Sequence, residues 1–207
     1  MRSRQLQLPG IPRFLEKSDY DEPSIFYEFD RAIDRLTRLY SFGYGLLPHD
    51  WGELCDRAER LAKDDLLNLA IHSRRFLTLA KAECLARNVE VPICKFTNDE
   101  SGVKALAVRP GETIWRIINT IVHHDNLTIV DSSSTVKIQV YRRPIWEVLS
   151  SGIEAMYPVV IVSSDQVPGI GFELRYFVLR LYFRVFEPVI ETLSNSGIYL
   201  EADLRDL

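Results

Sequence analysis

The chain has 207 residues, of which 46% are apolar and 26% are charged. These values are near the average for globular proteins, and they exclude a fibrous repeat, a largely disordered chain and a membrane-embedded bundle. The formal net charge of −4 also excludes binding to nucleic acid through a positive field over the whole surface, so any such contact needs a local basic site.

Neither the cysteines nor the apolar residues are arranged as in a secreted protein or a membrane protein. The three cysteines, Cys55, Cys84 and Cys94, lack the close spacing of a zinc knuckle or a disulfide framework. The N-terminal segment is locally basic but has no apolar stretch long enough for a signal peptide, and no window is apolar enough to span a bilayer. We therefore expect a cytoplasmic protein with no membrane contact.

Four segments carry the apolar period of amphipathic helices. They cover residues 24–42, 64–87, 112–124 and 172–193, and a further helix start is expected at Asp50, with Glu53 at capping-box spacing. Pro188 predicts a kink or a break near the end of the last helix.

The remaining segments predict a smaller β component. Prolines and glycines in residues 89–112 favour a loop with at most one short strand, whereas residues 135–143 and 157–165 read as strands. The sequence thus predicts a mostly α, α+β fold, in which about five helices form a bundle with a small two-stranded β element inserted near 130–165. Residues 1–20 would form an N-terminal arm, and residues 21–207 a single domain.

The predicted helix 112–124 has one polar face. At about 100° per residue, Arg116, Asn119, Thr120 and His123 fall on one side, and isoleucines fall on the opposite side. A helix at any protein surface shows such a division, so a solvated face explains the pattern as well as a site does.

The same residues could also act on a phosphodiester. The guanidinium of Arg116 suits a phosphate and the charge that develops on it, and histidine, the residue type at position 123, can accept or donate a proton near neutral pH. Together they could cleave RNA without a metal, since the histidine can assist attack by the ribose 2′-hydroxyl. Asn119 and Thr120 would orient the phosphate or the imidazole, with His124 as an additional substrate contact.

The spacing of Arg116 and His123, with six residues between them, resembles the Rx4–6H motif of the HEPN superfamily. This resemblance implies a helical bundle and a metal-independent endoribonuclease of the toxin or abortive-infection type, with no cofactor. It also implies a homodimer that brings two motifs into one cleft, and RNA and an antitoxin or regulatory protein as partners.

Two alternatives remain open. The first is a non-catalytic HEPN-like interaction or regulatory module. The second is an HD-type metal phosphohydrolase built on His124-Asp125, for which His72, Asp131 or His49-Asp50 would have to supply further ligands.

Overall fold

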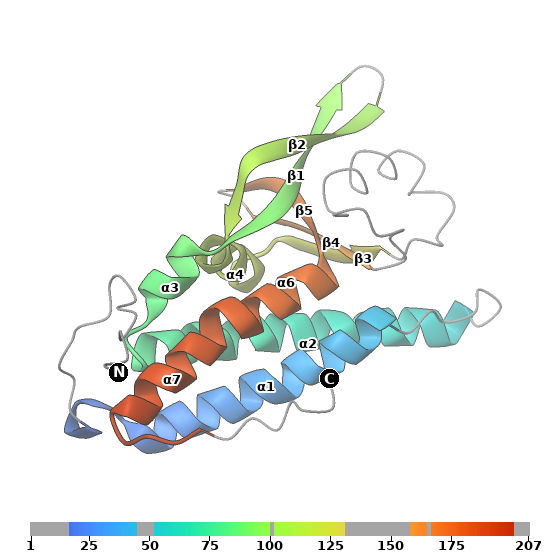
Figure 1. The fold of residues 1–207 in the computed structure, drawn as a ribbon. Helices are drawn as coiled ribbons and strands as arrows, with labels where there is room; N and C mark the ends of the chain where they lie inside the picture. Colours follow the sequence, from blue (N-terminus) through green and yellow to red (C-terminus); the bar gives the residue numbers. More distant parts are fainter. Residues whose placement is uncertain (1–16, 45–51, 100–101, 131–157, 165–166, 201–207) are drawn as a thin grey trace.

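The computed structural model describes residues 17–44, 52–99, 102–130, 158–164 and 167–200 and has the predicted α+β class (Figure 1). Most of the expected N-terminal arm, residues 1–16, lies outside the described part, as does the expected strand 135–143. The helical elements are η1 (Lys17–Asp19), α1 (Glu22–Tyr44), α2 (Gly52–Leu79), α3 (Glu83–Asn88), α4 (Ile114–Val122), α6 (Leu174–Leu181), the π-helix η2 (Tyr182–Phe186) and α7 (Glu187–Asn195). None of the described helices is long and apolar enough to cross a membrane.

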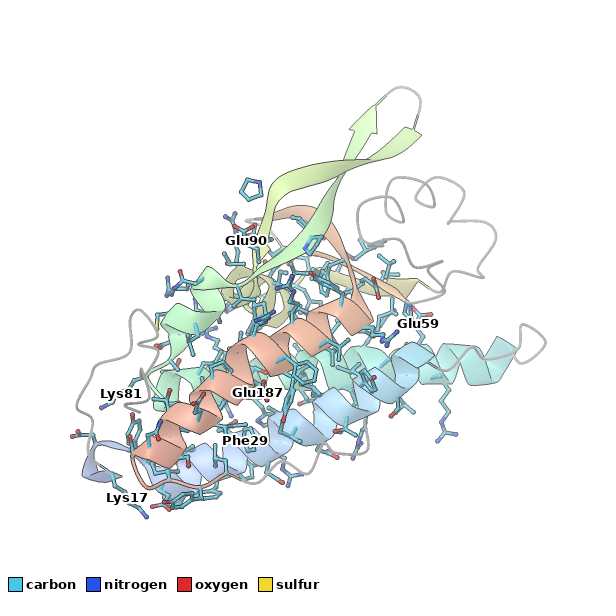
Figure 2. All side chains as sticks on the ribbon, viewed as in Figure 1. Lys17, Phe29, Glu59, Lys81, Glu90 and Glu187 are labelled. Atoms are coloured by element: carbon cyan, nitrogen blue, oxygen red, sulfur yellow. The ribbon has the colours of Figure 1, made fainter. Side chains whose placement is uncertain are left out.

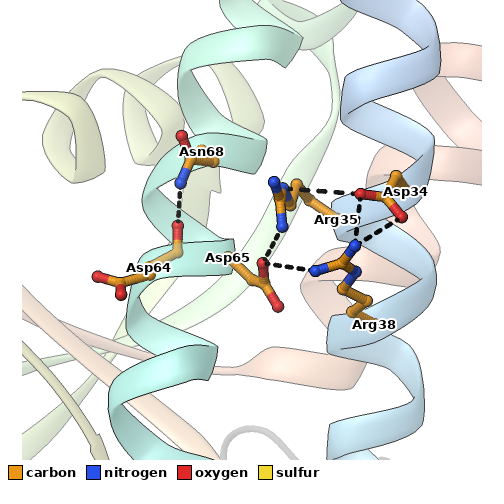
Figure 3. Close-up of polar contacts among 6 residues, drawn as sticks. All are labelled: Asp34, Arg35, Arg38, Asp64, Asp65 and Asn68. Atoms are coloured by element: carbon orange, nitrogen blue, oxygen red, sulfur yellow. Dashed lines mark hydrogen bonds and ion pairs between the residues drawn. The ribbon is translucent and has the colours of Figure 1, made fainter.

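Helices α1 and α2 pack along each other, and each presents an apolar face to the core. The buried residues of α1 recur at spacings of three and four: Ile25, Phe29, Ala32, Leu36 and Leu39. Phe26, the residue after Ile25, is exposed. At the polar edge, Arg35 and Arg38 of α1 lie 2.7 and 4.0 Å from Asp65 of α2 (Figure 3).

Three phenylalanines connect the main helices inside the core. The ring of Phe76 on α2 lies 5.2 Å from that of Phe29 on α1 and 5.3 Å from that of Phe186 in η2. Figure 2 labels Phe29 where α1 faces the helix formed by α6, η2 and α7. Aromatic pairs at these distances stabilise a core beyond their area burial.

The helix does not break at Pro188 but forms a short π-helical segment just before it. A proline in a regular α-helix clashes with the carbonyl four residues earlier, here that of Arg184. The chain widens by one residue just before it, so that the N–H of Glu187 donates to the carbonyl of Tyr182, five residues back. Helices α6 and α7 therefore continue as one rod past the proline (Figure 1).

The predicted helix 64–87 is divided in two. Helix α2 starts at Gly52 and ends at Leu79 in a Schellman motif, in which the N–H of Ala82 donates to the carbonyl of Leu77. Lys81 occupies the left-handed position of this motif, at φ 54°. Glycine usually marks that position, so its absence hid the end of the helix from sequence analysis.

The β component is larger than the two-stranded element expected. The strands β1 (Glu90–Asp99), β2 (Gly102–Thr113), β3 (Asn126–Val130), β4 (Val159–Ser164) and β5 (Val167–Glu173) form one sheet in the order β2-β1-β5-β4-β3. All of the paired strands are antiparallel.

The prediction of a loop over 89–112 was wrong, because β1 and β2 pair there. Pro92, Pro110 and Gly111 gather at one irregularity, where the register shifts between Val91 and Ile93. Prolines in a sheet are confined to edges and bulges, where no ladder hydrogen bond is lost. Gly111 is required at this point, since a Cβ atom there would lie 2.3 Å from the carbonyl oxygen of Val91.

Helix α4 lies between the sheet and the long helices (Figure 1), in contact with α2, α3, β2 and β4. The N–H of Ile114 donates to the carbonyl of Val89, which joins the start of α4 to the end of α3. After α4, the N–H of Asp125 donates to the carbonyl of Ser163 in β4. Both ends of the helix that carries the predicted site are thus fixed to other elements.

Candidate functional site

Helix α4 is shorter at both ends than predicted. It begins after Thr113, whose hydroxyl oxygen accepts from the backbone N–H of Arg116 at 3.3 Å, and it ends at Val122. A threonine in this position satisfies an N–H that the first helical turn leaves without a partner. His123 still follows the helical turn, because its N–H donates to the carbonyl of Asn119.

The apolar face of α4 fixes the direction of its polar face. Ile114, Ile117, Ile118 and Ile121 are fully buried. Burial of that side leaves Arg116 and His123 exposed on the opposite side, two helical turns apart.

Arg116 has a carboxylate partner. Its Nε lies 3.5 Å from Oε2 of Glu112, one turn earlier. The Glu112 side chain is 17% exposed and the Arg116 side chain 59%, so the pair lies at the surface, where ion pairs contribute little to stability. The guanidinium can therefore exchange this partner for a phosphate at small cost.

Asn119 and Thr120 bond to their own helix. The Asn119 amide donates to the carbonyl of Trp115 at 2.7 Å, and the Thr120 hydroxyl donates to the carbonyl of Arg116 at 2.9 Å. Thr120 is only 3% exposed, because its position borders the buried arc of α4. Its hydroxyl thus bonds to the backbone of its own helix, and the role of Thr120 in orienting the phosphate or the imidazole stays a prediction.

His123 contacts an arginine from another helix. Nη1 of Arg74, on α2, lies 3.2 Å from Nε2 of His123. Since a guanidinium only donates, this hydrogen bond requires Nε2 to accept, as it does in the imidazole tautomer that has its proton on Nδ1. Within the described part of the chain, no carboxylate forms an ion pair with Arg74.

His124 closes the end of the helix. Its Nδ1 donates to the carbonyl of Ile121 at 2.7 Å, which satisfies one of the last carbonyls of α4. His124 is partly buried, so it lies beside the exposed pair and fixes the backbone there.

The residues of the HD-type alternative are not brought together by the described structure. Nδ1 of His72 lies 2.6 Å from Oε2 of Glu28 on α1, so His72 faces that helix. His49, Asp50 and Asp131 lie outside the described residues. Over the ranges that the structure describes, no three His, Cys, Asp or Glu residues form a group suited to a metal ion.

Arg74 is a residue of the candidate site that the sequence pattern did not single out. It stands next to Arg75, and paired arginines on a helix usually form a solvated face. The two separate in the structure, because Arg75 approaches Glu28, at 3.5 Å, while Arg74 approaches His123. Nothing in the local sequence relates residues that are 49 positions apart.

Comparison with known proteins found no match. No family model matches the chain, and no curated protein or solved structure is significantly similar to it.

Proposed function

We propose that this protein is a HEPN-like, metal-independent endoribonuclease of the toxin or abortive-infection type, acting in the cytoplasm as a homodimer. The observation that supports this function best is the contact between Arg74 and His123, at 3.2 Å. In this contact, a guanidinium that has no carboxylate partner among the described residues lies beside an exposed imidazole. These two groups suffice in principle to bind a phosphodiester and to move a proton beside it.

The proposed reaction begins when a phosphate takes the place of His123 as the partner of Arg74. This exchange frees the lone pair of Nε2, which accepts the proton of the ribose 2′-hydroxyl. The 2′-oxygen forms a bond to phosphorus while the bond from phosphorus to the 5′-oxygen breaks. Water supplies a proton to the 5′-oxygen, and the products are a 2′,3′-cyclic phosphate and a 5′-hydroxyl.

Arg74 and Arg116 would have different tasks in this reaction. Arg74 would stabilise the charge that develops on the phosphate beside the imidazole. Arg116 lies two turns from His123 and is paired with Glu112, so we assign it to an adjacent phosphate of the same strand. The proposal thus transfers the main catalytic cation from Arg116 to Arg74.

A non-catalytic interaction module is the second candidate, supported by the exposed aromatic residues. Tyr27, Phe183 and Tyr199 are each more than half exposed. Large exposed aromatic side chains are typical of the centres of protein interfaces, and they would serve a dimer or an antitoxin partner.

The test is incubation of the purified protein with a mixed RNA pool in the presence of a chelator. We expect the wild type to cleave RNA and to leave DNA intact, and His123→Ala to lose cleavage with its circular dichroism spectrum unchanged. His72→Ala is the matched control, because that imidazole faces α1. Absence of cleavage by the wild type would favour the interaction module.

A further inference from the structure

A second arginine without a carboxylate partner lies at the other end of α4. The guanidinium carbon of Arg87, near the end of α3, lies 5.2 Å from the centre of the Trp115 ring. No carboxylate in the described ranges forms an ion pair with Arg87, whereas Arg75 and Arg116 approach Glu28 and Glu112. The positive charge of Arg87 is therefore available to a ligand.

The structure around Trp115 fixes this pair in place. The hydrogen bond from Ile114 to Val89, at 2.9 Å, joins the backbone of the two short helices directly beside it. Trp115 is partly buried against the core, and Arg87 is exposed. The exposed guanidinium of Arg87 thus lies over an indole ring that is anchored against the core.

The contact of Arg87 with Trp115 lies at the end of α4 where its polar face begins. Trp115 precedes Arg116, and Arg116 lies about 10 Å along the helix axis from His123. Arg87, Arg116 and Arg74 come from α3, α4 and α2, and each contacts a residue at or near one end of α4. The three arginines and the indole ring together suit a strand that has both phosphates and planar bases.

We infer that Arg87 and Trp115 form a base-stacking subsite for single-stranded nucleic acid. One base stacks on the outer face of the Arg87 guanidinium while the neighbouring phosphates contact Arg116 and Arg74. Stacking on arginine planes and aromatic rings is a common way in which proteins hold unpaired bases. The inference rests on the proposed function, since it positions the bases of the same substrate.

The experiment measures binding in the absence of cleavage. A short single-stranded oligo-deoxyadenylate is the probe, because it has bases and phosphates but no 2′-hydroxyl. Trp51→Phe and Trp146→Phe leave Trp115 as the single tryptophan, since the chain has three. We expect the probe to change the emission of Trp115, and inorganic phosphate to leave it unchanged.

Variants of Arg87 then test the stack itself. We expect Arg87→Ala to weaken binding of the probe by about 5- to 100-fold, and Arg87→Lys not to restore it, because an ammonium group has no plane on which a base can stack. Arg31→Ala is the matched control: that guanidinium lies 5.4 Å from the exposed ring of Tyr27 on α1. The control is expected to bind as tightly as the wild type.

The outcomes separate this inference from the proposed function. If Arg87→Ala weakens binding of the probe and Arg31→Ala does not, the result supports the subsite even if the wild type cleaves no RNA. Equal affinity of Arg87→Ala and the wild type, or an equal loss in Arg31→Ala, would overturn the subsite even if the wild type cleaves RNA. Capture of a protein partner instead of the oligonucleotide at this surface would also overturn it.

Discussion

Nη1 of Arg74 on α2 lies 3.2 Å from Nε2 of His123, immediately after the end of α4. Two elements that are distant in the sequence thus place a cation against an imidazole at the protein surface. The isoleucine face of α4 holds this arrangement, because its burial against the core fixes the position of His123.

Arg74→Ala should reduce RNA cleavage by about 10²- to 10³-fold, the usual effect of removing one donor that stabilises transition-state charge. Arg74→Lys should recover part of the rate, since it retains the charge but not the planar fork. Initial rates on one RNA substrate in a chelator measure both. Arg75→Ala, next to it in the sequence, should cleave at the wild-type rate, and an equal loss in that variant would contradict the role of Arg74.

Glu28→Ala should lower the free energy of unfolding by about 1 to 3 kcal/mol, because it removes the buried acceptor of His72 and Arg75. The measurement is urea denaturation at neutral pH. RNA cleavage per folded molecule should not change. The contacts of Glu28 with His72 and Arg75 lie between α1 and α2, whereas the proposed site lies between α2 and the end of α4. A loss of activity with full stability would show that Glu28 belongs to the site.

Glu173 should make stability depend on pH. Burial raises the pKa of its carboxyl group to about 7, although Arg175 opposes that increase. In the unfolded chain the carboxyl ionises near pH 4.5, so between these two pH values the folded state binds more protons. Stability should therefore fall as the pH rises from about 4.5 to 7.

The variant Glu173→Gln removes that titration. We expect it to be more stable than the wild type above pH 7 by about 1 to 2 kcal/mol, discounted for the water that screens part of the carboxyl, and to be equally stable below pH 4. Thermal unfolding from pH 4 to pH 8 measures the difference. A constant difference across that range would contradict the assignment.

Two helix ends offer a matched pair of substitutions. Lys81 and Gly197 both occupy the left-handed position of a Schellman motif, at φ 54° and 84°. Lys81→Gly should stabilise the protein by up to about 1 kcal/mol, although it also removes the contact of the ammonium with the Tyr20 ring. Gly197→Ala should destabilise it by about 1 kcal/mol, and chemical denaturation of both variants tests the two signs.

The helices could be predicted because their apolar residues recur with the helical period. In α4, four isoleucines define the buried face in the sequence, and the same four are buried in the structure. The exposed positions of Arg116 and His123 follow from that face. The burial of Thr120 could not be predicted in the same way, since this residue lies at the edge of the polar face and packing with neighbouring elements decides its burial.

The hairpin of β1 and β2 could not be predicted from local composition. Pro92, Pro110 and Gly111 individually oppose a strand, but they share one irregularity in the pairing, so the strands continue on both sides. The contact between Arg74 and His123 escaped prediction for a similar reason. The hairpin and this contact each depend on which residue from another part of the chain lies opposite. The hydrophobic period of a single segment does not contain that information.

The most direct test of the proposed chemistry is an analysis of the ends that cleavage produces. The wild type in a chelator should leave 2′,3′-cyclic phosphate and 5′-hydroxyl ends, and a single 2′-deoxy substitution on the 5′ side of the cleaved bond should block cleavage there. His123→Ala should reduce the rate by at least about 100-fold. Cleavage that continues past the 2′-deoxy position, or an unchanged rate in His123→Ala, would contradict attack by a 2′-hydroxyl assisted by this imidazole.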